Sequence, residues 1–235
     1  ATPRWMGGST DEVVNGSFET GDFDGWVVEQ WSRSFGDWFV VSGTESPVNA
    51  DEIPAPPCGA FAAVNDQSDP SSQVLCQDLV LKGGLAHRLR FTHYDVNEAD
   101  DEDGGTLFAS PPTLSPFTVG EANQQYCVDI VDPGADPFSV DAADPLLTVF
   151  ATGPGDPAQL EPPEVTGDHC ACAGRTVRLR FPEADNSGNF DVGVDCVAVE
   201  STAPTTTVPA PTATTSATPT TTAPRAVAAG PRFTG

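Results

Sequence analysis

The sequence predicts an all-β protein, a two-sheet jelly-roll β-sandwich followed by a disordered Thr/Pro-rich C-terminal tail. Between residues 11 and 200, apolar and polar residues alternate with a period of two, in short runs separated by Gly, Pro, Asp and Asn. From residue 201 onward, Thr, Pro and Ala make up nearly the whole sequence, a composition that cannot build a hydrophobic core. The chain therefore divides into an N-terminal extension (1–10), a β-sandwich (11–200) and a stalk or linker (201–235).

Eight segments of the sandwich region have the alternation and the flanking turn residues of strands. Around nine short strands with turn residues between them are typical of a β-sandwich, and no stretch shows the periodicity of a helix. In chain order, the eight predicted strands are 38–42, 60–65, 73–81, 87–96, 125–131, 146–152, 176–181 and 190–200.

The tetrapeptide Arg-Leu-Arg-Phe occurs in two of these strands, at residues 88–91 and 178–181. In each copy the Leu and Phe point to one side and both arginines to the other, as in a sheet with one face in the core and one in water. The arginines either pair with acidic side chains on neighbouring strands or lie on a concave face and donate bidentate hydrogen bonds to a ligand. The pattern leaves both interpretations open.

The charge of the chain excludes two classes of partner. The whole chain has a net charge of −24, and the first 200 residues carry all 34 acidic residues against eight basic ones, a net charge of −26. Such a surface repels nucleic acid and anionic membranes, and no apolar run reaches the length of about 18 residues that a membrane span needs. We therefore expect a neutral partner.

The cysteines and the N-terminus both point outside the cell. Six cysteines without a CxxC pair favour disulfides formed in an oxidising compartment, and the sequence does not choose among the pairings of Cys58, Cys76, Cys127, Cys170, Cys172 and Cys196. Three of them, Cys76, Cys127 and Cys196, occupy outward positions of predicted strands, which makes cross-strand bridges an expectation. The start of the chain looks like that of a secreted protein after removal of its signal peptide.

Residues 15–26, with the sequence NGSFETGDFDGW, resemble the opening strand of the galactose-binding-like jelly rolls. This class includes the glucan- and xylan-binding modules of bacterial glycoside hydrolases. Residues 72–79 (SQVLCQDL) are similar to its Leu-x-Gln strand, and residues 193–197 (GVDCV) to its closing Asp-Asp-Val strand. The three segments follow the family order, and the likeness is greatest to secreted bacterial members.

The resemblance implies a structural calcium ion between the first and last strands. The implied ligands are Glu19 of the opening segment and Asp195 of the closing one, with backbone carbonyls and Asp22 completing the shell, because calcium binds six to eight hard oxygens. Cys196 stands where the family often has a second Asp. The alternative is that Glu19 and Asp195 only cap strands and face solvent.

Candidate sugar-binding residues lie in the segment leading into the first long strand. Sugars are bound by aromatic faces that contact pyranose C–H groups and by planar polar side chains that bind hydroxyls. The aromatic candidates are Trp31, Phe35 and Trp38, of which Trp38 is equally compatible with burial in the core. On outward strand positions, the candidate polar residues are Arg90, Tyr94 and Asp129.

We therefore predict a non-catalytic, monomeric, extracellular binding module for a neutral polysaccharide or glycan, with calcium as a structural cofactor. The C-terminal stalk would link it to a cell wall or to another unit. The chain has neither a GxSxG nor an HExxH motif, and abundant acidic residues are not in themselves evidence of a glycosidase. The alternative is a structural or adhesive cell-surface domain that binds protein, and exposure of the three aromatic residues in one row distinguishes the two.

Overall fold

The computed structural model describes residues 10–68, 70–97, 113–115, 123–153, 156–159, 161, 163–168 and 172–203. Residues Ala1–Pro204 form one compact unit, separate from Thr205–Gly235. Nearly all of the predicted N-terminal extension and of the predicted stalk lies outside the described residues.

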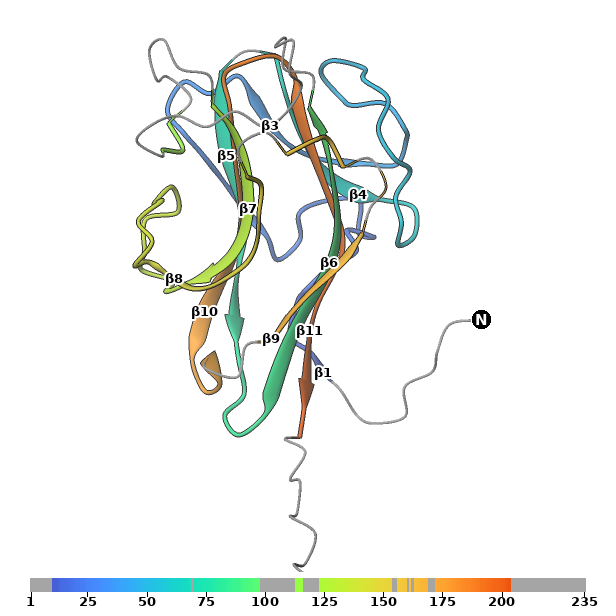
Figure 1. The fold of residues 1–235 in the computed structure, drawn as a ribbon. Helices are drawn as coiled ribbons and strands as arrows, with labels where there is room; N and C mark the ends of the chain where they lie inside the picture. Colours follow the sequence, from blue (N-terminus) through green and yellow to red (C-terminus); the bar gives the residue numbers. More distant parts are fainter. Residues whose placement is uncertain are drawn as a thin grey trace, which may run out of the picture. The chain divides into compact units, whose positions relative to one another are not determined.

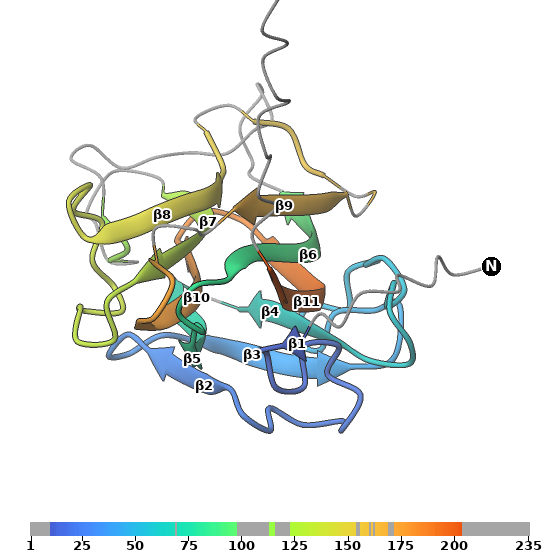
Figure 2. The ribbon, with the colours of Figure 1, turned by 90° about the horizontal axis from the view of Figure 1, so that it is seen from below.

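The protein is a jelly-roll β-sandwich of two antiparallel sheets, as predicted (Figure 1). Sheet A contains β1 (Thr10–Asp11), β3 (Gly36–Val41), β4 (Ala62–Gln67), β6 (Ala86–Asn97), β9 (Glu164–Asp168) and β11 (Phe190–Thr202). Sheet B contains β2 (Val27–Gln30), β5 (Ser71–Val80), β7 (Gln124–Val131), β8 (Pro145–Ala151) and β10 (Thr176–Asp185). The strand orders are β3-β4-β11-β6-β9, with β1 on β11, and β2-β5-β10-β7-β8. Figure 2 shows the two layers facing each other.

All eight predicted strands are present, with ends that differ by a few residues from the prediction. Three further strands, β1, β2 and β9, were not predicted, because each is short and lacks an alternating run of apolar residues. The last strand also continues beyond the predicted domain end at residue 200, since Ser201 pairs with Thr10 of β1. The described residues contain no α-helix, and no helix among them is long and apolar enough to span a membrane.

The two Arg-Leu-Arg-Phe copies occupy β6 and β10, which lie in opposite sheets. Their Leu and Phe side chains are buried in the core between the sheets, as predicted. Phe91 and Phe181 meet edge-on, with ring centroids 5.7 Å apart. The arrowheads of β5 and β11 point to one end of the sandwich, so their antiparallel partners β10 and β6 both run to the other end (Figure 1).

The disulfide of the described region joins Cys58 to Cys196, with Cα atoms 5.5 Å apart. It connects the segment before β4 to β11, so the expected cross-strand bridge at Cys196 is wrong. Cys76 and Cys127 are free thiols, because they lie on β5 and β7, which are separated by β10. Cys170 lies outside the described residues.

Candidate functional site

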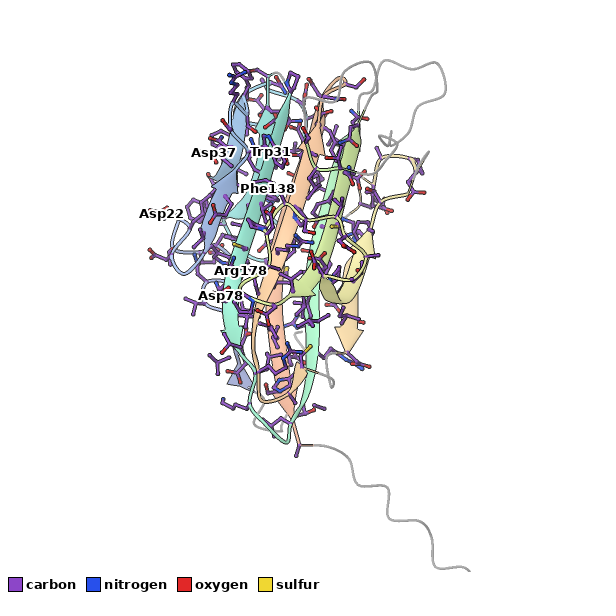
Figure 3. All side chains as sticks on the ribbon, turned by 90° about the vertical axis from the view of Figure 1, so that its left-hand side faces the viewer. Asp22, Trp31, Asp37, Asp78, Phe138 and Arg178 are labelled. Carbon is purple, nitrogen blue, oxygen red and sulfur yellow. A yellow bond between two sulfur atoms is a disulfide. The ribbon has the colours of Figure 1, made fainter. Side chains whose placement is uncertain are left out.

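The three predicted aromatic residues do not form one exposed row. Trp38 is 3% exposed and belongs to the core, because it lies on the inward side of β3 opposite Asn65 of β4. Phe35 is 55% exposed, and Trp31 is half-buried against Phe138, with ring centroids 5.1 Å apart. Figure 3 shows Trp31 and Phe138 together on the outer side of sheet B. Of the two alternatives that the sequence left open for Trp38, burial in the core is therefore the one that the structure shows.

The predicted polar residues lie on two different faces. Arg90 and Tyr94 point out of sheet A, whereas Asp129 points out of sheet B, so the three cannot line one site. Tyr94 and Asp129 are also buried, against the prediction. The reason is that loops cover the outward positions of both strands: Tyr94 packs with Ile53 of the β3–β4 connection, and Asp129 lies beneath the β7–β8 connection.

All four arginines of the repeat form ion pairs. The pairing interpretation of the sequence is thereby confirmed at every position, and Arg90 in particular contacts two carboxylates, of Glu200 and Glu164. The pairs are Arg88–Asp168 at 3.0 Å, Arg90–Glu200 at 3.1 Å and Arg90–Glu164 at 3.8 Å, Arg178–Asp78 at 2.7 Å and Arg180–Asp129 at 2.6 Å.

Glu19 and Asp195 lie close together, as the resemblance implied. The segment that precedes β4 connects them: Cys58 donates its N–H to Asp195 at 2.8 Å, and Ala60 and Phe61 donate theirs to Glu19 at 2.8 and 2.9 Å. Burial raises the pKa of Asp195 to about 6, and the charge of Glu19 contributes to the same direction. Gly59 is required here, since a Cβ atom at this position would lie 2.5 Å from the Glu19 carboxylate.

The two carboxylates offer hard oxygens of the kind that calcium binds, whereas the backbone groups that contact them are N–H donors and supply no oxygen. The sulfur atoms of Cys58 and Cys196 lie near Asp195, but in a disulfide they are not thiolate ligands. The carboxylate of Asp22, the third ligand that the resemblance implies, accepts the N–H of Phe23 at 2.7 Å, and Figure 3 shows Asp22 on a loop at the edge of the molecule.

A pocket of about 200 Å³ opens between the sheets, beside β6, β8 and β9. Its floor comes from β6 and its walls from β8 and the β8–β9 connection. The connection is fixed to β6 by two backbone hydrogen bonds between Asp95 and Gln159, of 3.1 and 3.0 Å. The lining residues are His93, Asp95, Phe150, Thr152, Asp156, Pro157, Gln159, Pro163 and Val165.

The pocket combines aromatic rings with hydrogen-bonding groups. His93 stacks on Phe150, with ring centroids 4.1 Å apart, and neither of its ring nitrogens has a hydrogen-bond partner. Burial lowers the pKa of His93 to about 4, so the ring is neutral at physiological pH. Burial raises the pKa of Asp95 to about 6, with a smaller contribution from the charge of Asp156. The pocket therefore offers two carboxylates, an imidazole and an amide beside an aromatic face.

The sequence carried a signal for this pocket. Leu89 and Phe91 of the repeat point into the core, so His93 and Asp95, which continue the same alternation, must point inward as well. Polar residues at core positions of a strand often mark a functional or strained site. Phe150 lies on β8 and Val165 on β9, and the other lining residues lie between these two strands, mostly in a segment without regular alternation that no pattern placed at a pocket.

No protein-family model and no curated protein matches the chain. Among solved structures, the chain is similar to the K3 adhesin domain of Lys-gingipain from Porphyromonas gingivalis W83, with 15% identity over 83% of this chain and 99% of that one and a TM-score of 0.48. TmCBM61 in complex with β-1,4-galactotriose is 18% identical over 81% and 98%, with a TM-score of 0.46. A cyclase from Fischerella is 16% identical over 82% and 98%, with a TM-score of 0.43.

Proposed function

We propose that this protein is a non-catalytic extracellular module that binds a neutral glycan in the pocket at Asp95 and Phe150. The observation that carries this proposal is the composition of the pocket, in which Phe150 lies beside the carboxylates of Asp95 and Asp156 and the amide of Gln159. An aromatic ring supports the C–H groups of a sugar, and ionised carboxylates accept strong hydrogen bonds from its hydroxyls.

The size of the pocket supports a small unit of a longer glycan as the bound part. Its volume of about 200 Å³ lies below the roughly 300 Å³ at which sites for drug-sized ligands begin. A single sugar residue at the end or side of a polysaccharide is a ligand of this scale. The disulfide Cys58–Cys196 supports an extracellular location, because such bonds persist in oxidising compartments.

The structural calcium ion is part of the same proposal. Glu19 and Asp195 would bind it, and the ion would neutralise two carboxylates that lie close together. Because Glu19 precedes β2 and Asp195 lies on β11, an ion bound by both would connect the beginning of the sandwich to its last strand. Its role would be to stabilise the fold and not to contact the glycan.

The second candidate function is adhesion to a protein through the outer face of sheet B. Val27 and Val80 are 52% and 67% exposed there, on the sheet face that also carries the Trp31–Phe138 pair. Exposed apolar side chains on a sheet face are a common feature of protein-binding surfaces. This surface is separate from the pocket, so substitutions distinguish the two functions.

Affinity electrophoresis and a glycan array against plant and microbial polysaccharides, with and without EDTA, test the proposal. In the variant Asp95→Asn, we expect affinity for the glycan to fall about tenfold or more, because a hydrogen bond to a charged group contributes about 1.5–3 kcal/mol. Binding by the unsubstituted protein should also weaken below about pH 6, where Asp95 takes up a proton.

Two variants act as controls. Asp168→Asn removes an exposed carboxylate of β9 outside the pocket and should leave glycan binding unchanged. Trp31→Ala alters the outer face of sheet B and should also leave it unchanged. If the folded protein binds no glycan, the proposal is wrong and adhesion is favoured. If the protein releases reducing sugar and this release depends on Asp95, the module is catalytic.

A further inference from the structure

The inner side of the sandwich becomes polar at the end to which β6 and β10 run. In β10, Leu179 and Phe181 face the core, and the alternation continues with Glu183 and Asp185, which are both buried. Glu183 pairs in register with Gln73 of β5 and Tyr126 of β7, and Asp185 with Ser71 and Gln124. Two buried carboxyl groups therefore lie within a layer of uncharged polar side chains.

Two hydrogen bonds connect this layer to the opposite sheet. Asn65 of β4 donates its amide N–H to Gln73 at 2.8 Å, and Gln67 donates to Asp185 at 2.8 Å. The side chain of Gln124 also forms a hydrogen bond with Asp185. These contacts place amide groups from both sheets around the two acidic residues.

Several oxygen atoms of this cluster have no hydrogen-bond partner although they are buried. Five such oxygens belong to four side chains: Asn65 Oδ1, Gln67 Oε1, Gln124 Oε1 and both carboxyl oxygens of Glu183. Burying a polar atom without a partner destabilises the fold, and burying a charged group without one does so more strongly. Two donors in register with the layer, Tyr126 Oη and Trp38 Nε1, are also unpartnered. The unpartnered acceptors outnumber them, and such an excess of acceptors favours a positively charged occupant.

No basic side chain among the described residues pairs with Glu183 or Asp185. Arg180, the nearest basic residue along β10, points to the other face of sheet B and pairs with Asp129. Burial raises the pKa of Glu183 well above its usual range, with further contributions from Asp185 and Asp191. The two acids therefore need either protons or a cation.

We propose that a calcium ion binds between the two sheets at this end of the sandwich, with Glu183 as its main ligand and the amide oxygens of Asn65, Gln67 and Gln124 in its shell. Calcium takes about six to eight oxygens at about 2.3–2.6 Å, and it accepts carboxylate and amide oxygens together. The five unpartnered oxygens would supply most of such a set, and the carboxylate of Asp185, which already accepts N–H groups of Gln67 and Ser187, would complete it. This site is distinct from the Glu19–Asp195 pair and independent of glycan binding.

The first test is a count of bound calcium in protein freed of metal with EDTA, by isothermal titration calorimetry. Glu183→Gln keeps the volume of the side chain and removes its charge, and we expect it to bind one equivalent fewer than the unsubstituted protein. At a hundredfold excess of calcium over its dissociation constant, the unsubstituted protein should gain about 5–10 °C in its thermal midpoint from this site. Glu183→Gln should lose that gain.

Two further variants separate this site from other sources of calcium binding. Glu19→Gln affects only the other pair and should leave the equivalent at Glu183 in place. Glu164→Gln removes an exposed carboxylate of β9 and is the matched control for nonspecific binding to the acidic surface. Equal stoichiometry and equal midpoint gain in Glu183→Gln and the unsubstituted protein would overturn the proposal.

A second measurement does not depend on any variant. Anomalous scattering from crystals grown in calcium should give a peak within bonding distance of Glu183. The proposal would be wrong if only water molecules occupied that position. It would also be wrong if the thermal midpoint rose as the pH fell and did not change with calcium, because protons would then neutralise the two acids.

Discussion

At the scale of single residues, the environment of an ion pair decides how much it stabilises the fold. Arg180 and Arg178 have the same chemistry and occupy alternate outward positions of β10. Arg180 is almost fully buried and, besides Asp129, donates to the carbonyl groups of Pro137 at 2.7 Å and Ser139 at 2.9 Å. The Arg178–Asp78 pair remains partly exposed, and Figure 3 shows it below the Trp31–Phe138 contact.

We therefore predict that Asp129→Ala lowers the free energy of unfolding by about 3–5 kcal/mol, because it leaves the buried guanidinium of Arg180 without its counter-charge. The matched control is Asp78→Ala, for which we expect a loss of about 1 kcal/mol or less. Urea unfolding followed by tryptophan fluorescence measures both. Similar losses in the two variants would show that the β7–β8 connection does not exclude water from Arg180.

Residue alternation within strands could be predicted from the sequence, and coverage by loops could not. The repeat correctly placed its leucines and phenylalanines in the core and its arginines on the outward faces, although Arg180 is covered by the β7–β8 connection. The same alternation placed Tyr94 and Asp129 on outward positions, which is right, but outward did not mean exposed. The covering segments, 42–61 and 132–144, have no regular periodicity, so nothing in the sequence indicates which strand they lie on.

At the scale of elements, the Cys58–Cys196 disulfide determines how the segment before β4 meets β11. The bond closes a loop with a sequence separation of 138 residues. It holds the segment whose Cys58, Ala60 and Phe61 N–H groups donate to the carboxylates of Glu19 and Asp195. A pairing between a loop and a strand cannot be read from strand alternation, which is why the sequence left the pairing open.

We predict that Cys58→Ser/Cys196→Ser lowers the free energy of unfolding by about 5 kcal/mol, since the entropic effect of a cross-link grows with the length of the closed loop. Guanidinium unfolding with and without dithiothreitol measures the effect. The unsubstituted protein should lose stability in the reductant, and the double variant should not respond to it. A double variant that is as stable as the oxidised protein would contradict this account.

At the scale of the whole molecule, the excess of acidic residues opposes folding. The net charge is −24, and only ten Lys and Arg are available to neutralise 34 acids. The arginines of the repeat strands form ion pairs with only a few of the carboxylates. Most of the remaining carboxylates therefore repel one another across the surface. Salt weakens this repulsion, because the Debye length shortens from about 30 Å at 0.01 M to about 3 Å at 1 M.

We predict that the thermal midpoint rises by several degrees as NaCl is increased from about 10 mM to about 500 mM at constant calcium, because screening removes self-repulsion from the compact state. The variant Asp24→Asn/Asp37→Asn removes two exposed charges while keeping their side-chain oxygens, and Asp37 Oδ1 accepts the N–H of Trp38 at 2.9 Å. It should be more stable than the unsubstituted protein in low salt, and the difference should disappear in high salt. A midpoint that falls with NaCl would instead mean that the surface ion pairs outweigh the repulsion, and differential scanning calorimetry of both proteins decides between the two.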